Sequence, residues 1–201
     1  MRRGDVVAVP TMVRDVTDER DALLAFLAEQ RAALRRAVHG LTDAQAAATP
    51  SASGLSLGAL VKHAGQVEST WMDLVAGEEV RLPDERDAFR MTPDETLDRL
   101  LADYAAAAER TDAVVAAEPD LGRRVDLTPM SPLLPAGAGR TVRWVVFHLV
   151  EETARHAGHA DVIRESLDGA SALDLVSAVG APLIPEYPHL TMGSVASRTG
   201  Q

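Results

Sequence analysis

The sequence contains no cysteine in its 201 residues. Disulfide bonds and thiolate metal ligands are therefore excluded, and any thiol chemistry has to use the sulfur of a substrate. Aromatic residues are also scarce, at 3% of the chain, so the hydrophobic core has to be mostly aliphatic. Runs of β-branched or aromatic residues of strand length are few, whereas the abundant alanine and leucine favour helix. These absences predict an all-α protein.

Basic residues are outnumbered, with 20 Lys and Arg against 30 Asp and Glu and a formal net charge of -10. An acidic surface argues against nucleic acid or an anionic membrane as the main partner. No run of 18 or more apolar residues indicates a membrane span. The opening MRRGDVVAVP lacks the apolar stretch of a signal peptide. We therefore expect a cytoplasmic protein that acts on a small molecule.

Four long segments carry apolar residues at the three- and four-residue spacing of amphipathic helices. The predicted helices cover residues 17–40, 56–77, 92–119 and 141–169. Together they predict a four-helix bundle with long connections, whose topology need not be a simple up-down-up-down one. We divide the chain into an N-terminal arm (1–16), the bundle (17–169) and a C-terminal tail that is partly docked (170–201).

Local signals predict where several elements begin. Thr42 and Gln45 form a capping box for a short helical turn, and Thr92 followed by Pro93 predicts the start of the third long helix. Residues 119–140 are rich in proline and glycine, so we expect a long loop without strands. Long loops in compact domains are often functional, which raises the question of whether this one covers a site as a lid.

The last predicted helix contains the polar stretch EETARHAGHA. At about 100° of rotation per residue, His148, Glu152, His156 and His159 fall within about 80° of one another, beside an apolar stripe. Glu152 and His156 are four residues apart, so their side chains meet over one helical turn. A carboxylate and an imidazole at this spacing can hold a divalent ion from one side.

A third candidate ligand lies on the second predicted helix. His63 stands between Leu60 and Val67, next to an apolar stripe of the same kind. If the two helices pack together, His63 can face Glu152 and His156 across the core. Two histidines and one carboxylate leave a coordination position open for water or substrate, which is typical of a reactive site.

The same residues also allow simpler interpretations. A histidine beside an apolar stripe is commonly buried with a hydrogen-bond partner, and a glutamate four residues before a histidine often bonds only to it. Three protein ligands already suffice, so His148 and His159 are expected to line the cleft rather than bind the ion. Glu151 and Arg155 turn to another face of the helix and predict an ordinary ion pair.

The segments LSLGALVKHAGQVESTWMDLVAGE and VRWVVFHLVEETARHAGHADVIRESLDG resemble the DinB-like metalloprotein superfamily. They are most similar to an actinobacterial branch related to mycothiol-dependent enzymes, and DERDALLAFLAEQRAAL resembles the same branch. The resemblance spans residues 17–169 and implies a DinB-like four-helix bundle with zinc or nickel in its core. Its ligands would be His63, Glu152 and His156, where many relatives have two histidines in place of the last pair.

The resemblance implies an enzyme that uses its metal ion to activate a low-molecular-weight thiol cosubstrate, mycothiol in actinobacteria, for transfer to a small electrophile. In such a thiol S-transferase, His159 or His148 could accept the proton or orient a ligand. Two other functions stay open. One is a metal- or small-ligand-binding bundle without turnover, such as a stress or resistance protein, and the other is a structural interaction protein. Superfamily members often form homodimers, so pairing with a second copy is also expected.

Overall fold

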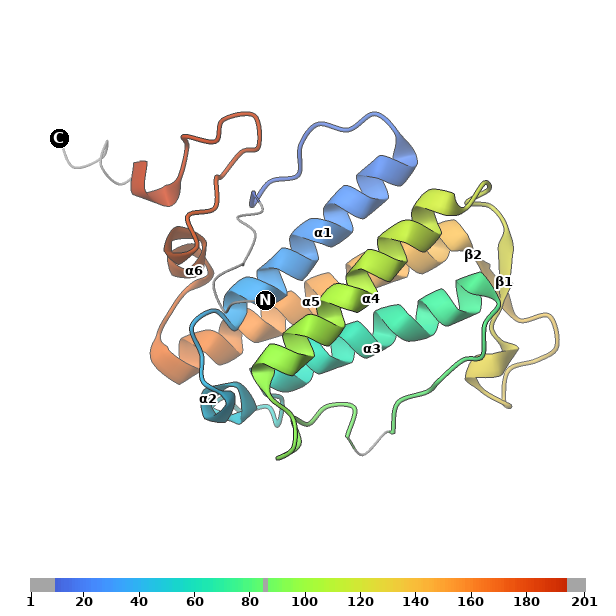
Figure 1. Ribbon diagram of the computed structural model, residues 1–201, viewed down its shortest axis with the longest axis horizontal. Coiled ribbons are helices and arrows are strands. Elements are labelled where there is room, and N and C mark those ends of the chain that lie inside the picture. The colour runs from blue at the N-terminus through green and yellow to red at the C-terminus, as the bar shows by residue number, and fades with distance from the viewer. Residues whose placement is uncertain (1–9, 85–86, 195–201) are drawn as a thin grey trace.

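The structure is a computed structural model that describes residues 10–84 and 87–194. Four long helices lie side by side and confirm the predicted all-α bundle (Figure 1). They are α1 (Glu19–Ala37), α3 (Leu57–Ala76), α4 (Leu97–Ala117) and α5 (Val142–Asp168). The short elements are the helices α2 (Asp43–Ala47) and α6 (Ala172–Ala178), the 3-10 turn η1 (Thr128–Met130), and the strands β1 (Arg124–Asp126) and β2 (Gly139–Thr141).

The long helices do not alternate in direction. On α3 and α4, Gly65 approaches Tyr104 and Asp73 pairs with Arg110, so the two helices run in parallel. The colour gradient in Figure 1 shows that α1 and α5 also run in parallel and that α3 and α5 run in opposite directions. Parallel neighbours cannot be joined by a tight turn, which explains the long connection between α3 and α4.

The ends of the long helices follow capping signals in the sequence. The side chains of Asp18, Ser56 and Thr141 each accept a backbone N–H in the first turn of α1, α3 and α5. At the other ends, Gly77 and Gly169 adopt left-handed conformations, with φ of 72° and 81°. Glycine takes this conformation without the steric cost of a Cβ, so the helices stop where the sequence predicts.

The start of α4 was predicted one turn too early. The helix begins at Leu97, and Thr96 rather than Thr92 caps it. The carboxylate of Glu95 accepts the backbone N–H of Thr92 at 2.7 Å and pairs with Lys62 of α3, also at 2.7 Å. The segment therefore forms a hydrogen-bonded turn fastened to α3, and the competing cap at Thr96 sets the true start.

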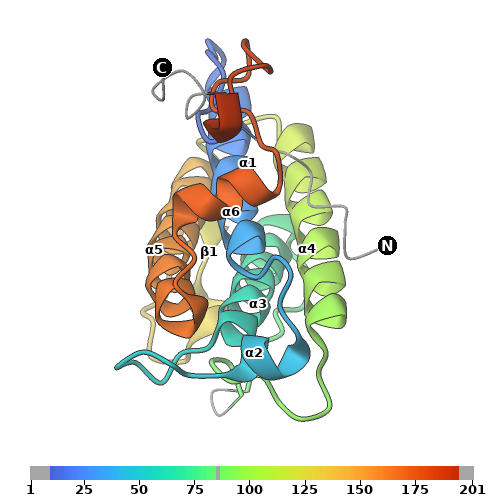
Figure 2. The same ribbon diagram turned by 90° about the vertical axis from the view of Figure 1, so that its left-hand side faces the viewer.

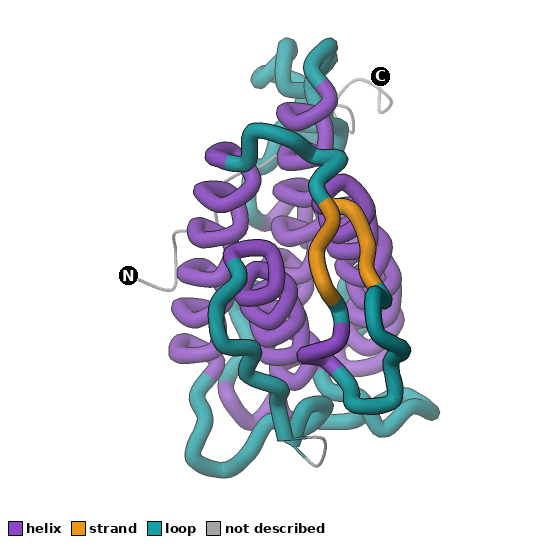
Figure 3. The backbone as a smooth tube through the Cα atoms, turned by 90° about the vertical axis from the view of Figure 1, so that its right-hand side faces the viewer, coloured by secondary structure: helices purple, strands orange, loops and turns teal. Residues whose placement is uncertain are grey.

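The prediction of a strand-free loop over residues 119–140 was also wrong. β1 and β2 pair antiparallel within the connection between α4 and α5, which lies along one end of the bundle (Figure 3). Gly139 permits this pairing, because a Cβ there would lie 2.8 Å from the carbonyl oxygen of Val125. Each strand has only three residues, which is too short for an alternating pattern to be recognised.

The bundle core has two apolar clusters, one where α5 begins and one where it ends. A polar layer separates them. Arg31 of α1 donates to both carboxylate oxygens of the fully buried Glu68 on α3, at 2.9 and 2.6 Å, and to Asp112 of α4 at 2.8 Å. Thr111 and Thr153 are buried in the same region of α4 and α5. The paired charges join three helices at mid-height.

The two ends of the described chain meet beside α1. Helix α6 packs on α1 (Figure 2), and farther along the tail the carbonyl of Pro182 accepts the backbone N–H of Thr11 at 3.2 Å. Residues 1–9 of the predicted arm and 195–201 of the predicted tail lie outside the described residues. Within the described part of the chain, no helix is both long enough and apolar enough to cross a membrane.

Candidate metal centre

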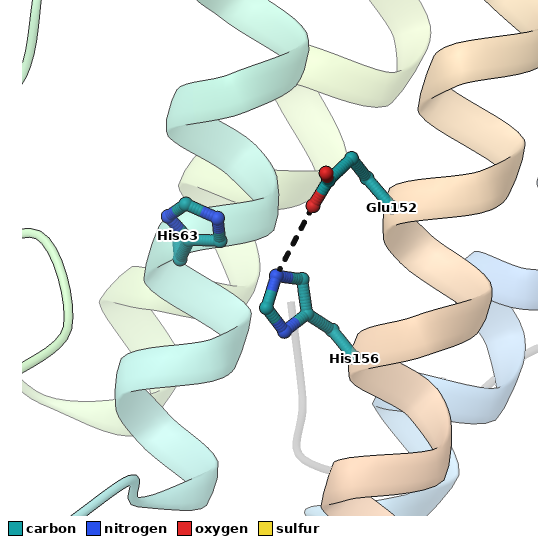
Figure 4. A group of neighbouring side chains, drawn as sticks. All are labelled: His63, Glu152 and His156. Carbon is teal, nitrogen blue, oxygen red and sulfur yellow. Dashed lines mark ion pairs between the residues drawn. The ribbon is translucent and has the colours of Figure 1, made fainter.

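The three predicted ligands meet at the interface of α3 and α5. His63 projects from α3 toward Glu152 and His156 of α5, and one donor atom from each residue lies within 4.8 Å of the other two (Figure 4). The Nε2 atom of His156 is 3.4 Å from Oε2 of Glu152. The imidazole rings of His63 and His156 are 4.8 Å apart between centroids and nearly perpendicular, at 79°.

The helical spacing of α5 determines which polar side chains face the site. His156 is buried, with 8% of its surface exposed, while its neighbours Glu151 and Arg155 are exposed on another face of the helix. Glu151 and Arg155 form the predicted ion pair, with 3.3 Å between Oε1 and Nη2. At this exposure such a pair contributes only a few tenths of a kcal/mol, roughly. The two faces of α5 therefore have different roles.

Burial keeps both histidines of the site in their neutral form. The pKa of His63 is lowered to about 4, chiefly by burial and then by the nearby His156, against a smaller raising effect from Glu152. Burial also lowers the pKa of His156, although Glu152 partly opposes this. Both imidazoles therefore present lone pairs at neutral pH, which is the state that binds a metal ion.

The donor set fits a divalent ion. Two neutral imidazoles and one carboxylate are ligands that zinc and similar divalent ions accept. Imidazole nitrogens and carboxylate oxygens bind zinc at about 2.0–2.2 Å, so two donors on one ion lie at most about 4.4 Å apart. The donors of the site lie within 4.8 Å of one another, so a small side-chain rotation brings them to one ion.

One aromatic ring lies over His63. The Phe89 ring is 4.2 Å from the His63 ring and 6.3 Å from the His156 ring between centroids. Phe89 belongs to the connection between α3 and α4. In the connection between α4 and α5, Arg123 donates to the carbonyl of Val75 at the far end of α3, at 2.7 Å. The α3–α4 connection therefore supplies part of the wall beside His63.

The other two histidines of the predicted face lie beside the donor group and do not belong to it. His159 is exposed, with its ring 5.6 Å from that of His156. His148 is half-buried between two indoles, stacked on Trp144 at 4.9 Å and 11° and edge-on to Trp71 at 5.1 Å and 72°. The two histidines thus flank the donors on opposite sides along α5.

The sequence patterns did not assign three aromatic residues of this region to the site. Trp144 precedes His148 by four residues and Trp71 follows His63 by eight, so extending the four-residue spacing along both helices could have found them. Phe89 lies in a polar connection without periodicity, and nothing in its neighbourhood in the sequence points to His63.

Comparisons with known proteins agree with this geometry. Residues 22–169 match the family model described as mycothiol S-transferase. A crystal structure of a conserved protein from Enterococcus faecalis is similar to this chain, with a TM-score of 0.60 and 17% sequence identity. The similarity covers 77% of this chain and 100% of that chain, and it supports the fold alone. Among curated proteins, none matches the chain significantly.

Proposed function

The chain belongs to the mycothiol S-transferase family, and from this membership we propose that it is a metal-dependent enzyme that transfers mycothiol to a small electrophile. The membership agrees with the DinB-like resemblance of the helices. We assign the metal ligands to His63, Glu152 and His156, with zinc or nickel as the ion. The observation that carries the proposal is the convergence of these three donors from two helices, with both imidazoles neutral.

The ligand set suits a reaction rather than a closed structural site. Three protein donors leave room for an exogenous ligand. When bound, a divalent ion would supply a Lewis acid that lowers the pKa of a thiol and favours the thiolate. His63 and His156 would bind as neutral donors, and Glu152 would contribute the single negative charge. The chain has no cysteine, so the thiol has to arrive as a cosubstrate.

We propose that His159 accepts the proton that the thiol releases. Its imidazole is exposed and lies 5.6 Å from that of His156, so it can both reach the site and pass a proton to water. His148 is held between two indoles one helical turn beyond Glu152, which suits orientation of a bound molecule. Phe89 contributes an apolar wall next to His63 and limits the access of water.

The use of a low-molecular-weight thiol also favours one cellular compartment. Low-molecular-weight thiols act in reducing compartments, where cysteine is kept reduced, and the cytoplasm is the one we propose. The acidic net charge of -10 leaves a small molecule rather than nucleic acid as the expected partner.

Metal content tests the first step. Elemental analysis of freshly purified protein should find close to one zinc or nickel ion per chain, and the His156→Ala variant should lose it. His189→Ala is the matched control, because His189 is exposed and lies in the C-terminal tail. If wild type and His156→Ala contain the same small amount of metal, the assignment of the site is wrong.

Thiol binding and turnover test the second step. In cobalt-substituted protein, mycothiol should change the visible absorption of the cobalt ion, whereas a control compound without the sulfur should not. The His159→Ala variant should keep its metal and lose about 10²-fold or more in turnover. Tight thiol binding without product across a panel of electrophiles would instead identify a binding protein.

A further inference from the structure

The face of α5 that bears the metal ligands continues toward the start of the helix. Arg140, Trp144, His148, Glu152 and His156 follow one another at intervals of four residues. The Cζ atom of Arg140 lies 5.1 Å from the centroid of the Trp144 ring, and the same indole stacks on His148 with 4.9 Å between ring centroids. The ligands of the metal site and this stack of planar groups therefore form one continuous strip.

Helix α3 completes the strip from the other side. Trp71 lies two turns beyond His63 and contacts both Trp144, at 5.7 Å, and His148, at 5.1 Å between ring centroids. Trp71 is 7% exposed, whereas Trp144 is 39% exposed and reaches the surface. At about 1.5 Å of rise per residue, His148 lies about 6 Å from Glu152 along α5. The aromatic groups are thus within reach of a small molecule bound at the metal site.

We propose that Trp71, Trp144, His148 and Arg140, here called the indole subsite, bind a polyhydroxylated ring carried by the thiol cosubstrate. This inference rests on the proposed function, since mycothiol carries its cysteine on an amino-sugar and inositol body. The C–H faces of such rings pack on indoles, and their hydroxyls need polar partners at the edge. Arg140 supplies donors, and the Glu151 carboxylate, 3.8 Å from Nδ1 of His148, supplies acceptors.

A ligand can displace the Arg140 guanidinium from the Trp144 ring at a small cost in free energy. Arg140 is exposed, and a cation–π contact at an exposed site contributes only about 0.5–1 kcal/mol. A ring that stacks on the indole can displace the guanidinium, which then donates to the ring hydroxyls. A purely apolar ligand would instead bury part of the edge formed by Arg140 and Glu151 without giving these charged groups a new hydrogen bond. The polar rim therefore favours a polyol over a hydrocarbon.

The chain offers a direct readout of this subsite, because it has two tryptophans and both belong to it. Full-length protein, stripped of metal with a chelator, is titrated with glucosaminyl-inositol, with myo-inositol and with N-acetylcysteine. Tryptophan fluorescence should change with one or both polyols and not with N-acetylcysteine. A response to myo-inositol assigns the inositol half, and a response to glucosaminyl-inositol alone assigns the amino sugar. No response to either polyol overturns the proposal.

Variants of Trp144 separate recognition from folding. By calorimetry, Trp144→Leu should bind the responding polyol about tenfold more weakly, while Trp144→Phe, which keeps a ring, should bind nearly as well as wild type. Phe147→Ala is the control, since Phe147 is exposed on the same helix and joins none of the ring contacts of the subsite among the described residues. Equal binding by wild type and Trp144→Leu overturns the subsite.

The metal-free titration also keeps the two proposals separate. Polyol binding that survives chelation supports the indole subsite whether or not the metal chemistry is correct. Metal and thiol binding in a protein that ignores the polyols leaves the proposed function intact and removes the subsite alone.

Discussion

The low pKa of the site histidines predicts a shallow dependence of metal binding on pH. An ordinary histidine, with a pKa near 6.5, is about nine-tenths protonated at pH 5.5 and would weaken metal binding about tenfold. His63 has its pKa lowered to about 4, so it stays almost entirely neutral at pH 5.5. The pKa of His156 is also lowered. Between pH 7.5 and 5.5 the affinity should therefore fall by less than about tenfold, against about a hundredfold for two ordinary histidines.

The same shift affects the stability of the metal-free protein, and its sign follows from linkage. In the unfolded chain His63 has its usual pKa of 6.5, so between pH 6.5 and 4 the unfolded state binds more protons than the folded one. Stability present above pH 6.5 is then lost as the pH falls toward 4, and because His63 is only partly buried, solvent screening keeps the loss well below about 3 kcal/mol. Urea unfolding of metal-free protein at several pH values measures this loss.

Two measurements test whether the pKa values of the site histidines are lowered. Competition with a chromophoric chelator gives the metal affinity at pH 7.5, 6.5 and 5.5, and NMR of the imidazole C–H protons follows each histidine in metal-free protein. The Phe89→Ala variant is the internal comparison, because it removes the ring over His63 and should move its pKa toward the ordinary value. A hundredfold loss of wild-type affinity, or a His63 that titrates near pH 6.5, would refute the reasoning.

Further predictions concern stability. Glu68→Gln removes one partner of a buried pair and should cost about 3 kcal/mol in urea unfolding, whereas Asp112→Asn, at a carboxylate with 50% exposure, should cost less than about 1 kcal/mol. Equal costs would contradict the described burial. Gly77→Ala places a Cβ at a φ of 72° and should cost about 1 kcal/mol in the same assay. Zinc at a thousandfold excess over its dissociation constant should stabilise wild type by about 4 kcal/mol and leave the His156→Ala variant unchanged in calorimetry, and an equal effect on both would place the ion elsewhere.

The sequence predicted the structure well wherever the relevant interactions lie within one helix. The caps at Ser56 and Thr141 and the stops at Gly77 and Gly169 act within a single turn, so the bounds of α3 and α5 could be predicted closely. The shared face of Glu152 and His156 follows from helical rotation alone. The position of His63 opposite them needed one further assumption, that the two apolar stripes pack together, and the structure shows this packing.

Prediction failed where contacts between distant segments, or competing local signals, determine the structure. Two capping sequences precede α4, and the turn at Thr92 is held by Lys62, a residue of another helix that local reasoning does not include. The β1–β2 pairing joins residues 13 to 17 apart in very short strands, and its register depends on Gly139 rather than on hydrophobic alternation. Phe89 reaches His63 only because the long connection folds back over α3.

The molecule itself contains the comparison that separates a structural polar cluster from a functional one. In the layer formed by Arg31 and Glu68, the three guanidinium nitrogens each donate to a carboxylate oxygen, so burial is compensated within the protein. At the α3–α5 interface, His63 and His156 are desolvated far enough to lower their pKa values, and among the described residues no arginine or lysine of the donor group compensates the Glu152 carboxylate beside them. Two neutral imidazoles that meet one carboxylate form a donor set for a divalent ion, so the imidazoles of this site fit metal binding better than a purely structural role.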